Sequence, residues 1–290
     1  MAKLSKLLLP ALALGLIGLS SCGRPAEGSG RSIIRNIGSD TLVNVAQSWS
    51  EAYGTVHPET QVAVSGGGSG TGISAMIDGT VDIANSSREM KSQEIEAAKK
   101  NGVQPLKHVV GFDAIAVYVH KDNPIEKLTL AQLASIYGEG GNITKWSQLG
   151  VKLSAKADNI VRISRQNNSG TYSYFKSVVL GKAGEYKLGS LDMHGSKDVV
   201  EQVSLTVGAI GYSGLAYAND HVRMVPVVNE SGAAVGPSVE SAMDNSYPIA
   251  RPLLMYTAGE PTGKIKEYMD WILSDEGQKI LRDKGYASVR

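Results

Sequence analysis

The chain has 290 residues, of which 33 are glycine and 20% are charged, and its formal net charge at pH 7 is +1. This length allows one large domain or two lobes, and the near-neutral charge gives no indication of a nucleic-acid partner. Cys22 is the only cysteine, so an intramolecular disulfide is excluded.

The first 22 residues predict export. Lys3 and Lys6 precede an almost wholly apolar stretch at 7–19, which is too short to span a bilayer and leads into the sequence Leu-Ser-Ser-Cys ending at Cys22. That sequence resembles the bacterial lipoprotein box, in which the cysteine becomes the lipidated first residue of the mature protein. We therefore expect residues 1–22 to be a lipoprotein signal peptide and Cys22 to carry a membrane anchor. The alternative is an ordinary signal peptide with an incidental cysteine.

The segment after the leader predicts a tether followed by a folded region. Residues 23–31 are rich in Gly, Pro and polar side chains, with nothing to pack. Loss of the leader removes two of the 29 basic residues and none of the 28 acidic ones, which leaves a net charge of −1. No later stretch has about 18 uninterrupted apolar residues, so we expect no membrane-spanning helix there.

From residue 33 onward, short apolar runs alternate with amphipathic segments, which is typical of α/β architecture. The predicted strands cover 33–37, 61–65, 81–84, 114–120, 160–164, 209–213 and 253–256. The predicted helices cover a segment opened by 38–41 and reaching about 53, then 73–77, 92–100, 129–137, 169–180, 197–207, 262–273 and 276–284.

Four predicted strand ends are each followed by a cluster of Ser, Thr, Gly, Asn or Asp and then by a predicted helix. The clusters cover 38–41, 65–72, 85–88 and 164–171. The first N–H groups of a helix lack intrahelical partners and the helix dipole adds partial positive charge, so such an end favours an anion. Ser and Thr are also common N-caps, which is an equal alternative for any single cluster. Four clusters, two of them with an arginine, indicate an anion site.

Arg88 and Arg165 are the arginines of these clusters. A guanidinium can donate two parallel hydrogen bonds to oxygens of a tetrahedral anion, and the alternative for each arginine is a surface salt bridge or a solvated charge. Ser169, Gly170 and Thr171 follow Arg165 in the same loop, which favours ligand contact at Arg165 over Arg88.

Motifs typical of enzymes and metal sites do not match. The glycine run at 66–72 fits neither G-x-G-x-x-G nor G-x-S-x-G, because Thr71 stands where the last glycine should be. The five histidines lack the spacing of metal ligands. We therefore expect no enzymatic activity, no cofactor and no metal. A hydrolase that uses Ser69 with a distant histidine is an alternative without further support.

With these segments in view, the chain resembles the periplasmic phosphate-binding protein family of ABC phosphate importers through nearly all of the region after the leader. The most specific segments are 65–72, 164–171, 209–213 and the tail 263–285. The tail is shared with other anion-binding relatives and therefore supports the fold more than the ligand.

The resemblance implies a two-lobed α/β fold, with mixed sheets flanked by helices and a ligand in the cleft between the lobes. Two crossing segments would join the lobes near 117–123 and 245–252. Lobe one would comprise 31–119 and 248–290, and lobe two 120–247.

The resemblance also implies a set of phosphate contacts. Carried over by motif position, they are Asp40, Thr41, Ser69, Ser87, Arg165, Ser169, Gly170 and Thr171. The clusters at the predicted strand ends add Ser39, Gly70 and Arg88.

One position departs from the family. Many members have an aspartate where this chain has Ser87, and that carboxylate accepts the proton of HPO4²⁻, which sulfate lacks. We hypothesise that Asp40 supplies the acceptor here; its alternative role is an N-cap or an acid in the first helical turn.

These observations predict a binding protein that captures inorganic phosphate outside the cytoplasmic membrane and delivers it to the permease subunits of an ABC transporter. The alternatives are a binding protein for sulfate or molybdate, a phosphate-dependent enzyme such as a phosphatase, and a sensing or adhesive surface lipoprotein. We expect a lipid-anchored monomer in the periplasm or at the cell surface of a bacterium, without a nucleic-acid partner.

Overall fold

The computed structural model of the chain describes residues 32–290, which belong to one compact unit. The predicted signal peptide at 1–22, the lipidation site Cys22 and the tether at 23–31 lie outside the described residues. These three features therefore stay predictions.

A nine-stranded mixed sheet runs through the described residues, in the order β2-β1-β3-β12-β4-β8-β6-β7, with β9 paired to β4. Its strands are β1 (Ser32–Gly38), β2 (Thr60–Ser65), β3 (Ile83–Ser86), β4 (Leu106–His120), β6 (Val161–Arg165), β7 (Leu191–Met193), β8 (Ala209–Gly214), β9 (Val222–Val225) and β12 (Ala250–Thr257). A smaller sheet joins β5 (Leu128–Thr129), β10 (Val227–Val228) and β11 (Ala234–Val235).

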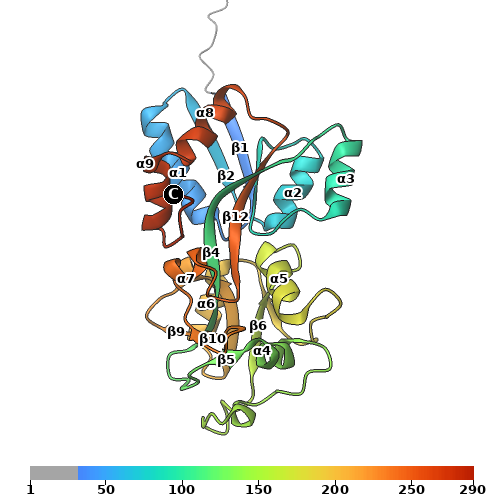
Figure 1. Cartoon of the computed structure of the whole chain (residues 1–290), viewed down its shortest axis with the longest axis vertical. Helices are drawn as coiled ribbons and strands as arrows, with labels where there is room; N and C mark the ends of the chain where they lie inside the picture. The colour runs from blue at the N-terminus through green and yellow to red at the C-terminus, as the bar shows by residue number, and fades with distance from the viewer. Residues whose placement is uncertain (1–31) are drawn as a thin grey trace, which may run out of the picture. The chain divides into compact units, whose positions relative to one another are not determined.

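Helices connect most of the strands (Figure 1). They are α1 (Val43–Val56), α2 (Ser69–Ile77), α3 (Ser92–Lys100), α4 (Leu130–Tyr137), α5 (Gly170–Phe175), α6 (Ser196–Ser204), α7 (Val239–Met243), α8 (Gly263–Ile272) and α9 (Asp275–Asp283). A π-helical segment, η2 (Lys176–Leu180), continues α5, and two short 3-10 helices are η1 (Trp146–Leu149) and η3 (Leu215–Tyr217). The predicted α/β class, with a mixed sheet and flanking helices, is confirmed.

The hydrophobic core of residues 32–290 falls into two groups of clusters. In the first group, α1, α8 and α9 pack on one cluster that includes Trp49, and α2 and α3 pack on another that includes Met76. In the second group, α4 and α5 pack on a cluster that includes Trp146 and Phe175, and α6 packs on a cluster that includes Val199.

The strands β4 and β12 belong to both groups. They pair antiparallel along most of their length, and Figure 1 shows them running side by side from the group of α1, α8 and α9 to that of α4–α7. Along β4, Val110 packs in the first group and Ala114 in the second. Along β12, Ala250 packs against the second group and Leu253 in the first. The lobe limits of 31–119 with 248–290 and 120–247 stay a prediction, but the packing places the change of core in β4 between Val110 and Ala114.

Every predicted strand and helix overlaps an element of the structure. The largest difference is β4, which begins at Leu106 instead of 114. The sequence does not predict the first half of this strand, because that half is only partly buried and lacks a continuous apolar run. Helix α2 begins at Ser69, inside the glycine run, although glycine is a poor helix former. Some elements have too few residues to show a periodicity. They are the three strands of the small sheet, the strands β7 and β9 of the large sheet, and helix α7. Across residues 32–290, the structure contains no helix long and apolar enough to cross a membrane.

Candidate functional site

The candidate site lies where β1, β2 and β3 end. The three strands are parallel, so their carboxyl ends meet at one edge of the sheet, which is where ligands bind in open α/β sheets. The loop that follows β6 reaches the same place from the second group of elements, because Thr171 Oγ1 lies 3.1 Å from Thr41 Oγ1. The four predicted clusters therefore come together in space.

Five side-chain hydroxyls form the centre of the site, and we call them the hydroxyl cluster. They belong to Ser39, Thr41, Ser69, Ser87 and Thr171, each at most 2% exposed. Ser39 Oγ donates to Ser87 Oγ at 2.9 Å, and Ser87 Oγ lies 3.3 Å from Ser69 Oγ. Because a hydroxyl both donates and accepts, the cluster can satisfy itself and can also turn its O–H groups toward an anion.

A buried ion pair, Arg251 with Asp113, lies beside the hydroxyl cluster. Arg251 Nη2 donates to Asp113 Oδ2 at 2.8 Å, and both side chains are completely buried. The same nitrogen lies 3.1 Å from the hydroxyls of Thr41 and Thr171, and Arg251 Nη1 donates to the carbonyl oxygen of Ser87 at 3.2 Å. Arg251 therefore holds segments from both groups of elements.

The pKa of the Asp113 carboxyl is raised by burial, and the neighbouring Arg251 opposes this shift. Sequence reasoning misses both residues, because each lies inside a strand of the structure, just before the predicted strands at 114–120 and 253–256, and not in a cluster at a strand end. The only signal in the sequence is that each charge interrupts an apolar segment. In the structure, the two residues stand opposite each other in the pairing of β4 and β12.

A second ion pair joins Arg165 to Asp40. Arg165 is 1% exposed, and its Nη2 donates to Asp40 Oδ2 at 2.7 Å. Other donors of the guanidinium bond to the hydroxyl of Ser196 at 3.0 Å and to the carbonyl oxygen of His194 at 2.7 Å. Burial lowers the pKa of Arg165, and the charge of Asp40 acts in the opposite direction. The other carboxylate oxygen of Asp40 accepts from the backbone N–H of Gly67 at 2.8 Å.

Arg88 has a different partner from the one predicted for an anion site. Its Nη1 and Nη2 donate to the two carboxylate oxygens of Glu94 at 2.8 and 2.7 Å, and Nη1 also donates to the carbonyl oxygen of Glu89. The structure thus places the guanidinium in an ion pair with α3, and any contact with an anion would compete with this pair. Its predicted role as a ligand contact stays a prediction.

Three other predicted residues have defined structural roles. Gly70 donates its N–H to the carbonyl oxygen of Asn168 at 2.8 Å. Ser169 is the N-cap of α5, and its Oγ accepts from the N–H groups of Thr171 and Tyr172. Gly170 lies against the hydroxyl cluster, where an added Cβ would fall 2.2 Å from one serine Oγ and 2.5 Å from another. Only glycine fits there without displacing the cluster.

Two tyrosines fix the backbone of the turn after β1. Tyr217 Oη donates to the carbonyl oxygen of Asp40 at 2.6 Å, and Tyr286 Oη donates to that of Thr41. Burial raises the pKa of both phenols, so they remain donors across the physiological range. They hold the turn in the position that presents Asp40 and Thr41 to the site.

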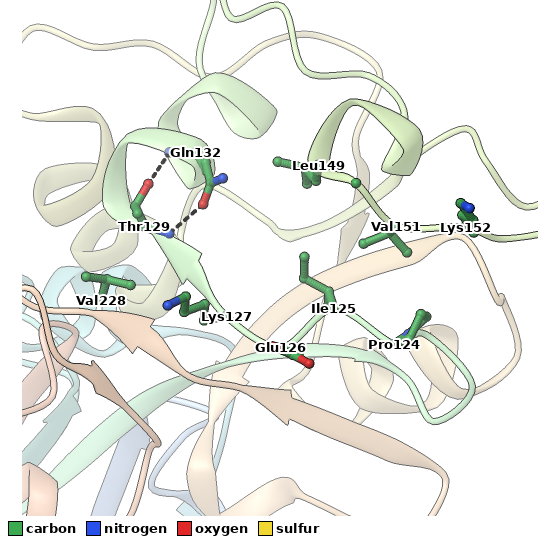
Figure 2. A pocket seen from close by; sticks show the side chains of 11 residues that line it. Pro124, Ile125, Glu126, Lys127, Thr129, Gln132, Leu149, Val151, Lys152 and Val228 are labelled. Atoms are coloured by element: carbon green, nitrogen blue, oxygen red, sulfur yellow. Dashed lines mark hydrogen bonds between the residues drawn. The ribbon is translucent and has the colours of Figure 1, made fainter.

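Two cavities of the described residues differ in their relation to this site. One of about 390 Å³ is lined by Ser87, Arg88 and Tyr174 among others, and so reaches the hydroxyl cluster. Another of about 620 Å³ shares no residue with the site. Figure 2 shows the latter with the capping box of α4, in which Thr129 and Gln132 exchange hydrogen bonds of 2.8 and 3.0 Å. No group of three or more His, Cys, Asp or Glu that could hold a metal occurs within 32–290.

Comparison with known proteins gives consistent matches. The profile described as PBP superfamily domain matches residues 24–276. The chain is 32% identical over 265 residues to the phosphate-binding protein PstS of Pseudomonas aeruginosa, which covers 87% of this chain and 82% of that protein.

Two solved structures are also similar. The first is a phosphate ABC transporter substrate-binding protein from Clostridium perfringens with bound phosphate, at 32% identity and a TM-score of 0.79, covering 89% of this chain and 100% of that one. The second is an ABC-type phosphate transport receptor from Vibrio cholerae, at 27% identity and a TM-score of 0.70, covering 89% and 100%.

Proposed function

Because the chain belongs to the PBP superfamily, we propose that it is the phosphate-binding component of an ABC phosphate transporter. It captures inorganic phosphate outside the cytoplasmic membrane and delivers it to the permease subunits. The predicted resemblance to phosphate-binding proteins is confirmed by the relatives, and the two-lobed fold by the similarity to the Clostridium perfringens structure. Its role is binding and transport, and we propose no catalytic step.

The observation that carries this proposal is the convergence of five buried hydroxyls from four separate segments. On binding, each O–H that now bonds another hydroxyl would instead donate to a phosphate oxygen. Hydrogen bonds to an ionised acceptor are shorter and about twice as strong as neutral ones, so this exchange favours the complex. The guanidinium of Arg251 lies beside the cluster, and that of Arg165 bonds Asp40 in the adjoining turn; both groups can donate hydrogen bonds to the anion.

We propose that Asp40 provides selectivity for phosphate over sulfate. It is 9% exposed, and as a carboxylate it can only accept hydrogen bonds. A phosphate that retains a proton can donate to it, whereas a fully deprotonated oxyanion would place an oxygen against a carboxylate oxygen. A site built around a ligand O–H disfavours an analogue that lacks it. Asp40→Asn should therefore reduce the preference for phosphate over sulfate, and an unchanged preference would contradict the assignment.

Calorimetric titration tests the phosphate proposal directly. The purified protein, freed of ligand by partial unfolding and refolding, is titrated with phosphate, sulfate and molybdate at neutral pH. Arg165→Ala should weaken phosphate binding roughly 30-fold to several thousand-fold, the range for losing one member of a buried charge pair. Arg162→Ala is the matched control, since its guanidinium on the same strand bonds Leu188 and Ser190 away from the hydroxyl cluster. Equal affinities for the two variants would contradict the site.

One second candidate deserves the same titration. Ser87 stands where the resemblance places an aspartate in many family members, and a site without that acceptor could favour sulfate or molybdate. Tight binding of either anion without a phosphate response would keep the fold and the cleft and change the ligand.

We further propose that Cys22 is lipidated and anchors a monomer to a bacterial membrane, in the periplasm or at the cell surface. The leader sequence supports the anchor, and the relatives support the location. Mass spectrometry of the membrane fraction should find a lipid on Cys22, and Cys22→Ser should release the protein into the soluble fraction. A protein that stays in the membrane after this substitution would contradict the anchor.

A further inference from the structure

Asn168 connects the loop after β6 to the glycine run at 66–72, in which α2 begins. Its Nδ2 donates to the carbonyl oxygen of Gly67 at 2.8 Å, and its own carbonyl oxygen accepts from the N–H of Gly70, also at 2.8 Å. The loop follows a strand of the second core group, and helix α2 of the first group begins inside the glycine run. Both hydrogen bonds therefore join the two groups of elements.

The glycine run is shaped to receive Asn168. Gly67 and Gly68 have φ angles of 109° and 92°, which favour glycine. A Cβ on Gly68 would lie 2.8 Å from the carbonyl oxygen of Asn168, and one on Gly70 would lie 3.1 Å from it. These contacts involve backbone atoms, so they cannot relax by rotating a side chain. The glycines thus allow the close approach of Asn168.

Asn168 is tied to the site without being part of the hydroxyl cluster. Its side-chain donor is used by Gly67, whose N–H in turn donates to Asp40, the partner of Arg165. Besides the hydroxyl cluster, the segment 164–171 therefore contacts the first group of elements at two points: Arg165 bonds Asp40, and Asn168 bonds the glycine run. Of these two contacts, only the one made by Arg165 involves charged side chains.

We propose that Asn168 is a positioning residue that sets the affinity for phosphate by stabilising the closed arrangement of the two lobes. This inference rests on the proposed function, in which phosphate is held between the lobes. A contact made only in the closed form raises the population of that form, and the apparent dissociation constant falls in proportion. Because the contact forms after the first encounter, it slows phosphate release and leaves the association rate unchanged.

Asn168→Ala removes the bond to Gly67 and keeps the backbone bond to Gly70. One hydrogen bond of this kind predicts a dissociation constant about 2- to 12-fold higher, measured by calorimetry, with the change in the release rate measured by stopped-flow fluorescence. Asn168→Asp keeps the shape but places a carboxylate oxygen against the Gly67 carbonyl, so we expect an effect at least as large. Neither variant should change the melting temperature of the phosphate-free protein by more than a few degrees.

Asn167→Ala is the matched control, because Asn167 is exposed and its side chain has no hydrogen bond to any residue of 32–290. It should bind phosphate as the parent protein does. Equal affinities for the parent, Asn168→Ala and Asn168→Asp would overturn the inference, as would an equal loss in Asn167→Ala or a loss confined to the association rate. A parent protein that binds no phosphate would instead refute the proposed function itself.

Discussion

The ion pair between Arg251 and Asp113 predicts an effect on the unfolding free energy that can be measured without a ligand. Both side chains are completely buried and stand opposite each other on β12 and β4. Removal of Arg251 leaves Asp113 with one remaining hydrogen bond, a 3.3 Å contact from the N–H of Leu215. Breaking a buried pair in this way costs about 3–5 kcal/mol, because the remaining charge stays buried without a partner. We expect this loss in the unfolding free energy of Arg251→Met and a similar one for Asp113→Leu.

The double variant distinguishes the pair from its surroundings. With both charges replaced by apolar side chains of similar size, no unpaired charge remains, and most of the lost stability should return. Urea unfolding of the phosphate-free protein, followed by tryptophan fluorescence, measures all four proteins. Phosphate affinity should stay low in the double variant, because Arg251 no longer orients Thr41 and Thr171. Single variants within about 1 kcal/mol of the parent, or a double variant that loses the sum of both, would refute the reasoning.

Three further predictions test separate parts of the structure. Gly170→Ala forces a Cβ into the hydroxyl cluster; we expect a loss of about 1–3 kcal/mol in stability and weaker phosphate binding, and an unchanged affinity would mean that the cluster is not the binding site. Burial by itself raises the pKa of Glu94, but the hydrogen bonds from Arg88 and from the Lys91 N–H outweigh it, so the pKa is lowered. The ionised Glu94 side chain therefore stabilises the fold above its unfolded pKa of about 4.3, and this stabilisation is lost as the pH falls through the lowered folded pKa. The pH dependence of the unfolding free energy should accordingly become flatter in Glu94→Gln. Thr129→Ala removes the N-cap of α4 and should cost about 1 kcal/mol in urea unfolding without changing phosphate affinity, whereas a changed affinity would connect this distant helix to the site.

The sequence predicts the parts of the site that are local. Each cluster at a strand end contains its own turn and cap, so its composition is visible within eight residues. The start of α4 is of the same kind: the predicted helix at 129–137 begins with Thr129, which is the N-cap in the structure, its Oγ1 accepting from the N–H of Gln132. The position of the clusters at one edge of the sheet follows from the parallel pairing of β1, β2 and β3.

The missed residues depend on contacts that are distant in the sequence. Asp113 and Arg251 are 138 residues apart, and only the register of β4 against β12 makes them neighbours. For Arg88, the cluster predicts a ligand contact, which stays a prediction, and does not reveal the bidentate partner Glu94, six residues away on α3. A composition pattern shows that an arginine is near a helix start and does not show which acceptor it faces.

The arrangement of charges indicates how the site can select its ligand. Arg165 and Arg251 are each paired with a buried carboxylate, Arg165 with Asp40 and Arg251 with Asp113. The net charge of these four groups is therefore close to zero, so attraction of any anion by a positive field is weak. Discrimination must then come from the direction of hydrogen bonds, in which hydroxyls and guanidinium groups donate and carboxylates accept. A site of this composition fits an anion that carries both acceptors and a donor, and protonated phosphate has both.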